Sequence, residues 1–92
     1  MIVRIMGEGQ YRLPEAVHPR VNELDNAVVA AVDKDDEDAF HASFEEMLDV
    51  IRTEGEHLGD EELETSDVIV PPADTSMAEA AAEFSGDGLI PD

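Results

Sequence analysis

The sequence contains no cysteine and only five basic residues among its 92. Without cysteine, the chain can form neither disulfides nor thiolate metal sites. It also has no apolar run near the roughly 20 residues that a membrane-spanning helix needs. The opening Met1–Met6 segment is too short and too interrupted for a secretory signal. We therefore expect a cytoplasmic protein of modest stability, since so short a chain buries only about 60–65% of its unfolded surface.

Basic residues are few because the composition is strongly acidic, with 24 Asp and Glu residues and a net charge of −19. This balance excludes nucleic acid and anionic membranes as direct partners, since both bind basic surfaces. An acidic chain can be disordered, but disordered chains lack regularly spaced apolar residues. Here the acidic residues are interleaved with regular apolar stripes, and hydrophobic residues make up 42% of the chain. We therefore expect a protein of a salt-accumulating cytoplasm, where the screening length falls to about 3 Å at 1 M salt.

The segment 20–53 predicts two amphipathic helices that form an antiparallel hairpin. Apolar residues recur at steps of three and four, which places them on one face of each helix. The first face comprises Val21, Leu24, Ala27, Val28, Ala31 and Val32, and the second Phe40, Phe44, Met47, Leu48 and Ile51. The polar side comprises Glu23, Asp25, Asp38, Glu45, Glu46, Asp49 and Arg52. Asp35 or Asp36 is expected to cap the second helix, and the hairpin to serve as core.

Residues 2–13 predict a β-hairpin around Gly7-Glu8-Gly9, with positive φ at Gly9. The expected cross-strand pairs are Met6–Gln10, Ile5–Tyr11, Arg4–Arg12 and Val3–Leu13. One face then carries Val3, Ile5, Tyr11 and Leu13 and covers the helical hairpin, and the other carries Arg4, Met6, Gln10 and Arg12. Two arginines directly opposite one another need an anion, which either the protein's own carboxylates or an acidic partner segment supplies.

Prolines and glycines delimit the remaining segments. Pro14–Pro19 forms a connector, with Pro19 in the first turn of the helix, and Gly55 ends the second helix before an acidic loop over 56–64. Residues 66–70 predict a third strand beside residues 2–6, stopped by Pro71-Pro72.

A last short helix is expected near the carboxyl end of the sequence. Thr75 or Ser76 caps it, with Glu79 completing a capping box, and Gly86 stops it. Its apolar side comprises Met77, Ala80, Ala81 and Phe84. The expected fold is one α+β domain over residues 1–86. In it, a three-stranded antiparallel sheet of order 2-1-3 packs on the helical hairpin, with the short helix at one end. In the tail 87–92, Leu89 and Ile90 either pack against the core or contact a partner.

No catalytic or nucleotide-binding motif is present. The acidic run Asp33–Asp38 lacks the glycine and the terminal acid of a calcium loop. His41 and Glu45, one helical turn apart, would supply half a metal site. We expect no cofactor and no metal. A metal-dependent regulator or enzyme using these residues is the alternative, and binding heat with calcium, zinc or manganese would identify it. A self-associating structural protein, pairing exposed sheet edges, is a further alternative.

Four stretches together resemble the PspAA family, the small PspA-associated proteins of the phage-shock membrane-stress system in archaea and actinobacteria. They are the opening MIVRIMGEGQ over residues 1–10, NELDN over 22–26, SDVIVPPAD over 66–74 and GLIP over 88–91. The resemblance spans nearly the whole chain, and its specificity lies in the order and spacing of these stretches.

The resemblance implies a non-enzymatic adaptor or regulator that binds PspA, a coiled-coil membrane-remodelling protein, during envelope stress. It implies that the protein reaches the inner face of the cell membrane only through that partner. The expected partner contacts are Arg4, Met6, Gln10 and Arg12 on the outer sheet face, and Leu89 and Ile90 in the tail. Strand addition and helix docking are the natural modes of contact.

Overall fold

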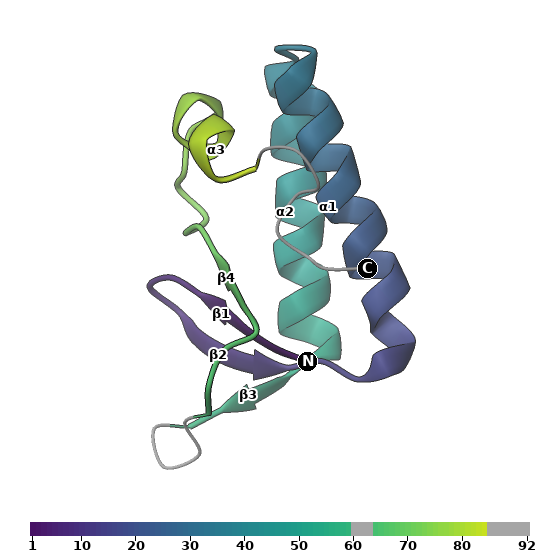
Figure 1. Ribbon diagram of the computed structural model, residues 1–92, viewed down its shortest axis with the longest axis vertical. Helices are drawn as coiled ribbons and strands as arrows, with labels where there is room; N and C mark the ends of the chain where they lie inside the picture. Colours follow the sequence, from purple (N-terminus) through teal and green to yellow (C-terminus); the bar gives the residue numbers. More distant parts are fainter. Residues whose placement is uncertain (60–63, 85–92) are drawn as a thin grey trace.

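The computed structural model describes residues 1–59 and 64–84. Its elements are, in order, β1 (Ile2–Ile5), β2 (Gly9–Arg12), the 3-10 helix η1 (Glu15–Val17), α1 (His18–Asp33), α2 (Glu37–Glu54), β3 (Glu56–Leu58), β4 (Val68–Val70) and α3 (Met77–Glu83). They form two layers, with the α1–α2 hairpin on one side and the sheet and α3 on the other (Figure 1). The α+β class is confirmed. The boundary predicted after residue 86 lies outside the described residues, as do Leu89 and Ile90.

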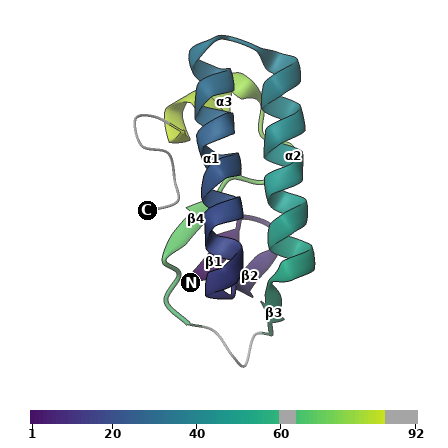
Figure 2. The same ribbon diagram turned by 90° about the vertical axis from the view of Figure 1, so that its right-hand side faces the viewer.

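The helices α1 and α2 lie side by side and antiparallel, joined by a short turn (Figure 2). Asp36 caps α2, since its carboxylate accepts a hydrogen bond from the Ala39 amide at 3.1 Å. Asp35 adopts a left-handed conformation, with φ at 56°, which reverses the chain before the cap. The predicted helical hairpin is confirmed, with Asp36 as the cap.

The apolar face of α2 is the predicted one, because Phe40, Phe44, Met47, Leu48 and Ile51 are all buried. The face of α1 is largely the predicted one, since Val21, Val28 and Ala31 are buried and Leu24 and Val32 pack against the core, but it differs at two positions. Asp25 is fully buried although it was expected on the polar side, and Ala27 is exposed. Asp25 follows Val21 by four residues and precedes Val28 by three, so it lies on the same side of the helix as these two core residues. The predicted polar side was therefore wrong at Asp25.

The sheet has four strands in the order β3-β2-β1-β4, so the prediction of three antiparallel strands was wrong. The strand β4 lies beside β1 as expected, but the two run parallel, with Val3 opposite Val68 and Ile5 opposite Val70. The additional strand β3 pairs antiparallel with β2 and uses residues that were expected in the acidic loop.

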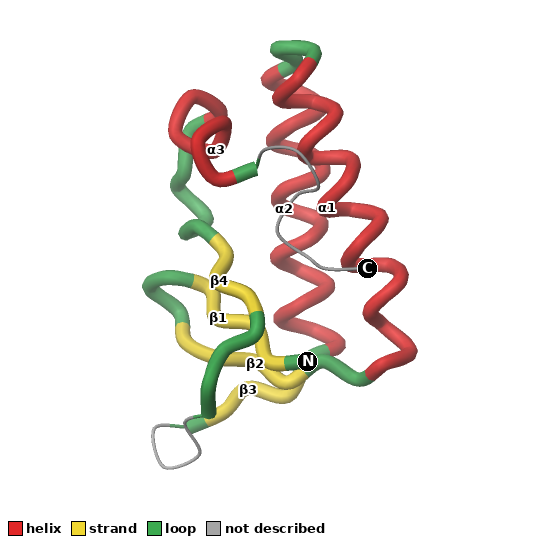
Figure 3. Tube along the Cα trace, viewed as in Figure 1, coloured by secondary structure: helices red, strands yellow, loops and turns green. Residues whose placement is uncertain are grey.

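The path of residues 64–67 explains the direction of β4. Hydrogen bonds with the side chain of Gln10 hold Glu64 and Ser66 over β2, and Asp67 then reaches the start of β1. Figure 3 shows the loop that leads into β4 crossing β2. There the Asp67 amide donates to the Ile2 carbonyl at 2.8 Å, and the Ile2 amide donates to the Asp67 carboxylate at 2.8 Å. Because the chain arrives beside the first residue of β1, the next strand has to run in the same direction as β1.

The β1–β2 hairpin forms, with a register different from the predicted one. Val3 lies opposite Tyr11 and Arg4 opposite Gln10, because the loop comprises Met6, Gly7 and Glu8. Both Gly7, at φ 87°, and Gly9, at φ 117°, take positive φ, which lets the turn close one residue earlier. Relative to the prediction, the partner of each β1 residue moves by two positions, for example from Leu13 to Tyr11 for Val3. Because side chains alternate with a period of two, each residue keeps its predicted face.

The inner face of the sheet covers the helices as predicted. Val3, Ile5 and Leu13 are at most 2% exposed and belong to the same core cluster as the helix residues, with Tyr11 partly buried against it. This burial confirms that the small sheet and the helical hairpin share one core.

The short helix α3 packs against α1 and α2, near the end of the hairpin that lies away from the sheet (Figure 1). Ser76 and Glu79 form the predicted capping box. Ala80 and Phe84 are buried and Met77 is partly buried, whereas Ala81 is exposed. The Phe84 ring meets Phe44 of α2 edge to face, with 5.8 Å between centroids. Gly86, the predicted stop, lies outside the described residues.

Candidate functional site

The outer face of the sheet is divided into a covered part and an open part. In the covered part, Gln10 is only 1% exposed, because residues 64–67 pass over it. Its Nε2 donates to the Glu64 carbonyl and to Ser66 Oγ at 2.8 Å, and its Oε1 accepts from the Glu64 amide at 3.1 Å. Gln10 therefore holds the crossing segment in place instead of facing solvent.

Arg12 is also occupied within the chain. It lies opposite Ile2, not opposite Arg4, so the predicted pairing of two arginines was wrong. Its guanidinium forms ion pairs with Glu64 and, at 3.5 Å, with Glu56 of β3. The protein's own carboxylates thus pair with Arg12. This was one of the two sources of an anion that the sequence suggested, the other being an acidic segment of a partner.

The open part of the outer face is formed by Arg4, Met6 and Ile69. Arg4 and Ile69 are direct partners in the β1–β4 register, and Met6 follows Arg4 by two residues on the same side of the chain. The Met6 amide donates to the Val70 carbonyl at 3.0 Å, so the hydrogen bonding between β1 and β4 continues as far as Met6. Met6 is 53% exposed and Ile69 is 55% exposed, and Arg4 beside them is half-buried.

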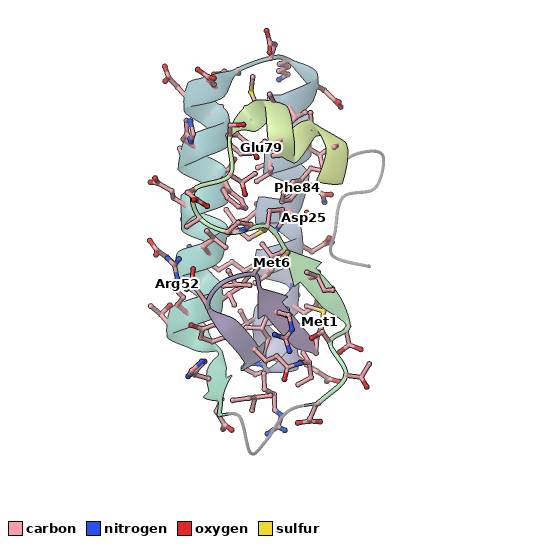
Figure 4. The ribbon with its side chains drawn as sticks, turned by 90° about the vertical axis from the view of Figure 1, so that its left-hand side faces the viewer. Met1, Met6, Asp25, Arg52, Glu79 and Phe84 are labelled. Carbon is pink, nitrogen blue, oxygen red and sulfur yellow. The ribbon has the colours of Figure 1, made fainter. Side chains whose placement is uncertain are left out.

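A groove begins at Met6 and Ile69 and extends to the start of α3. Its lining continues through Pro71 and Pro72 to Thr75 and Glu79, and its volume is about 220 Å³. Figure 4 shows Met6 between the sheet and α3, which carries Glu79. Sites for drug-sized ligands usually enclose about 300–1,000 Å³, so this groove suits a few side chains better than a cofactor.

Charges of opposite sign flank this groove. Hydrogen bonds from Ser76, its backbone amide first, lower the pKa of the Glu79 carboxyl, which keeps it ionised at neutral pH. On the sheet side, Arg4 forms no ion pair with any carboxylate of residues 1–59 and 64–84, whereas Arg12, Arg20 and Arg52 each do. The groove therefore has the Glu79 carboxylate at one end, and beside the other a guanidinium that is unpaired among the described residues.

A second hollow, of about 250 Å³, lies between α1 and α2 and is lined by Arg20, Glu23, Leu24, Ala27 and Glu46. An ion pair of 3.1 Å between Arg20 and Glu46 crosses from one helix to the other at this hollow. Most of its lining is charged, so it offers little apolar surface to a ligand.

The residues of the metal hypothesis do not converge. Within the described part of the chain, no group of three or more His, Cys, Asp or Glu side chains could hold a metal ion. In the run Asp33–Asp38, Asp36 is engaged as the cap of α2. His41 is exposed and contacts the neighbouring Phe40 ring, with 5.1 Å between centroids. No described helix combines the length and apolar character needed to cross a bilayer.

The family model for PspAA, described as PspA-Associated protein, matches residues 1–92. The chain belongs to the PspAA family. Neither the curated proteins nor the solved structures include a significant match to it. Membership of PspAA confirms the resemblance seen in the four sequence stretches.

In this PspAA member, Met6 is exposed and Arg4 half-buried without an ion pair to a described carboxylate, whereas Gln10 is buried and the exposed Arg12 is paired with Glu64. Sequence reasoning missed Ile69, Pro71 and Pro72 as part of the same surface. A signal for Ile69 was present, because alternation along Val68-Ile69-Val70 places the central side chain opposite to its two buried neighbours.

Proposed function

We propose that this PspAA member is a non-enzymatic adaptor or regulator that binds a PspA-like coiled-coil protein in the envelope-stress response. The family match over residues 1–92 carries this proposal, since the family is described by its association with PspA. The absence of a catalytic or nucleotide-binding motif from the sequence agrees with a binding role.

The open part of the outer sheet face is the proposed contact surface. Arg4 and Met6 remain candidates from the sequence, and Ile69 joins them because it is exposed beside both. Gln10, which is buried, and Arg12, which is exposed, support this surface indirectly, because they hold Glu64 and Ser66 across the sheet. Leu89 and Ile90 stay proposed contacts on the basis of their sequence alone.

The proposed location is the cytoplasm, with recruitment to the inner face of the cell membrane through PspA. The composition supports recruitment through a partner, because binding to anionic lipids needs a basic surface, which five basic residues against 24 acidic ones do not provide. The same composition supports an origin in a salt-accumulating archaeon, where concentrated salt screens the repulsion.

Co-purification from native lysate in molar KCl tests the proposal. A tagged full-length chain is expected to retain PspA, identified by mass spectrometry, and purified PspA is expected to bind it directly. High salt matters, because it prevents the acidic chain from collecting basic proteins nonspecifically. If purified PspA shows no binding at any salt concentration, the adaptor role is wrong.

A further inference from the structure

Met6 and Ile69 are the large apolar side chains that the described residues leave exposed, and both line the groove between the sheet and α3. Pro71 and Pro72 add further apolar lining. Scattered exposed hydrophobic residues are ordinary, but two that share one groove in a chain with 24 acidic residues mark an interaction surface.

The charges beside this groove restrict what fits it. Arg4 lies next to Ile69 across the β1–β4 pairing and forms no ion pair with a described carboxylate. A guanidinium next to apolar side chains is well suited to a carboxylate from a partner, because their pairing strengthens as water is excluded. At the opposite end of the groove, the Glu79 carboxylate favours a cationic group of the partner. The matching occupant therefore carries an apolar ridge with an acidic residue on one flank.

The backbone around the groove favours a helix over an added strand. The edge strand β4 has only three residues, and the two prolines that follow it have no amide hydrogen to donate. Strand addition depends on such main-chain bonds, whereas helix docking depends on side chains entering a groove at spacings of three and four. A volume of about 220 Å³ accommodates a few such side chains.

We propose that this groove binds an amphipathic helix of the partner, whose apolar ridge packs on Met6 and Ile69 and whose flanking carboxylate pairs with Arg4. This inference rests on the proposed function, because it assigns a surface and a binding mode to the association with PspA. A second copy of the chain is disfavoured as the occupant, since the large apolar side chains that its described residues expose are Met6 and Ile69, which line the groove itself and do not lie on a helix.

A pair of charge reversals tests the role of Arg4. Arg4→Glu and Lys34→Glu change the net charge equally, but Lys34 follows α1 in the α1–α2 turn, at the opposite end of the molecule from the sheet that carries Arg4 (Figure 1). In molar KCl, Arg4→Glu is expected to weaken binding of purified PspA by about tenfold or more. Lys34→Glu is expected to leave the dissociation constant within about twofold, since long-range effects are screened.

A second experiment tests the apolar contact. The double variant Met6→Ser/Ile69→Ser is expected to weaken PspA binding by about tenfold or more, as loss of two central apolar contacts does. Both side chains are more than half exposed, so the thermal midpoint measured by circular dichroism is expected to stay unchanged.

A third experiment identifies the segment of PspA that occupies the groove. A photo-crosslinking residue at position 69 is expected to attach to one segment of PspA with apolar residues at helical spacing and an adjacent Asp or Glu. Reversal of that acidic residue to Arg is expected to restore binding to Arg4→Glu.

The outcomes separate the two proposals. Wild-type binding that is insensitive to Arg4→Glu and to the double serine variant overturns the groove while leaving the adaptor role intact. Crosslinking to an extended segment overturns the helical mode. A dimer in light scattering that Ile69→Ser dissociates shows that a second copy occupies the groove, and overturns this inference. A wild-type chain that fails to bind PspA overturns both.

Discussion

Gly55 joins α2 to β3 at a point where the chain has no room for a side chain. Its φ of −86° and ψ of 156° are open to any residue, so the requirement is steric and not conformational. A Cβ at this position would lie 2.5 Å from the Ile51 carbonyl oxygen and 2.9 Å from Leu13 Cδ2. The Ile51 oxygen belongs to the backbone and Leu13 is a buried core side chain, so neither atom can shift freely to make room for a Cβ.

Gly55→Ala is therefore expected to destabilise the fold by about 1–3 kcal/mol, the usual cost of overpacking a core. Urea unfolding in molar KCl, followed by circular dichroism, measures the change. Gly59→Ala is the matched control, because a Cβ at Gly59 meets no atom within 4 Å. Equal effects of the two substitutions would contradict the steric argument.

Glu8 and Arg52 form a contact between the β1–β2 turn and α2. Arg52 Nε donates to Glu8 Oε1 at 2.7 Å and Nη2 donates to Oε2 at 2.5 Å, and Nη1 reaches Asp49 at 3.1 Å. The hydrogen bond from Arg52 lowers the pKa of the Glu8 carboxyl below its ordinary value. The folded state therefore binds the proton of Glu8 less well than the unfolded chain does.

This direction predicts how stability depends on pH. The contribution of Glu8 is present above the ordinary carboxyl pKa and is lost as pH falls through the lowered pKa of the folded state. Glu8→Gln is expected to destabilise the protein at pH 7 by up to about 1 kcal/mol, since the pair is partly exposed. The difference from wild type should shrink toward pH 3, as measured by thermal midpoints. Glu45→Gln, an exposed change of equal charge on α2, controls for net charge, and a pH-independent difference for Glu8→Gln would contradict the prediction.

The seven-residue helix α3 is too short to be stable alone, so its cap and its contacts with the core hold it. In the capping box, the Glu79 amide donates to Ser76 Oγ at 3.2 Å, and the Ser76 amide donates to the Glu79 carboxylate at 3.1 Å. Ser76→Ala is expected to cost about 1 kcal/mol and to speed hydrogen exchange in α3 more than in α1 and α2. Ser43→Ala, which removes a hydroxyl bonded to Ala39 within α2, is the control. Uniform exchange changes across all three helices would contradict a local role.

Sequence reasoning predicted the elements whose signals are local. The helices follow from apolar spacing and from caps such as Asp36 and Ser76, which depend only on near neighbours. The direction of β4 depends instead on where residues 64–67 cross the sheet, and that path is set by hydrogen bonds between Gln10 and residues more than 50 positions away. No local pattern encodes such a contact, and β3, only three residues long, gave no periodic signal.

The candidate site was predictable to the same extent. The face on which Arg4 and Met6 lie follows from alternation along the strand, and the change of register left it unaltered. The burial of Gln10 and the ion pair of the exposed Arg12 with Glu64 both follow from the crossing segment, which pairing rules for one hairpin do not describe. The proximity of Ile69 to Met6 could not be predicted without knowing that β4 lies parallel to β1 in the sheet.

At the scale of the whole molecule, three of the five basic residues form ion pairs between different parts of the fold. Arg12 connects β2 to Glu56 and Glu64, Arg20 connects α1 to Glu46 of α2, and Arg52 connects α2 to Glu8. Each of these contacts joins segments that are far apart in the sequence. Five bases cannot neutralise 24 acids, so most carboxylates repel one another across the surface.

This excess predicts a fold whose stability depends on salt. The thermal midpoint is expected to rise steadily between dilute buffer and molar KCl, because the screening length shortens from about 30 Å at 0.01 M to about 3 Å at 1 M. Circular dichroism at fixed pH measures it. The variant Glu23→Gln/Asp38→Gln/Glu45→Gln removes three exposed carboxylates for which the described residues show no ion pair.

The triple variant is expected to be more stable than wild type in dilute buffer and to respond less steeply to KCl, because it starts with less repulsion to screen. Sucrose stabilises folded proteins without screening charge, so it should raise both midpoints equally. A wild-type midpoint that does not change with KCl would show that the 24 acidic residues cost the fold little, and the argument for a high-salt cytoplasm would lose its physical basis.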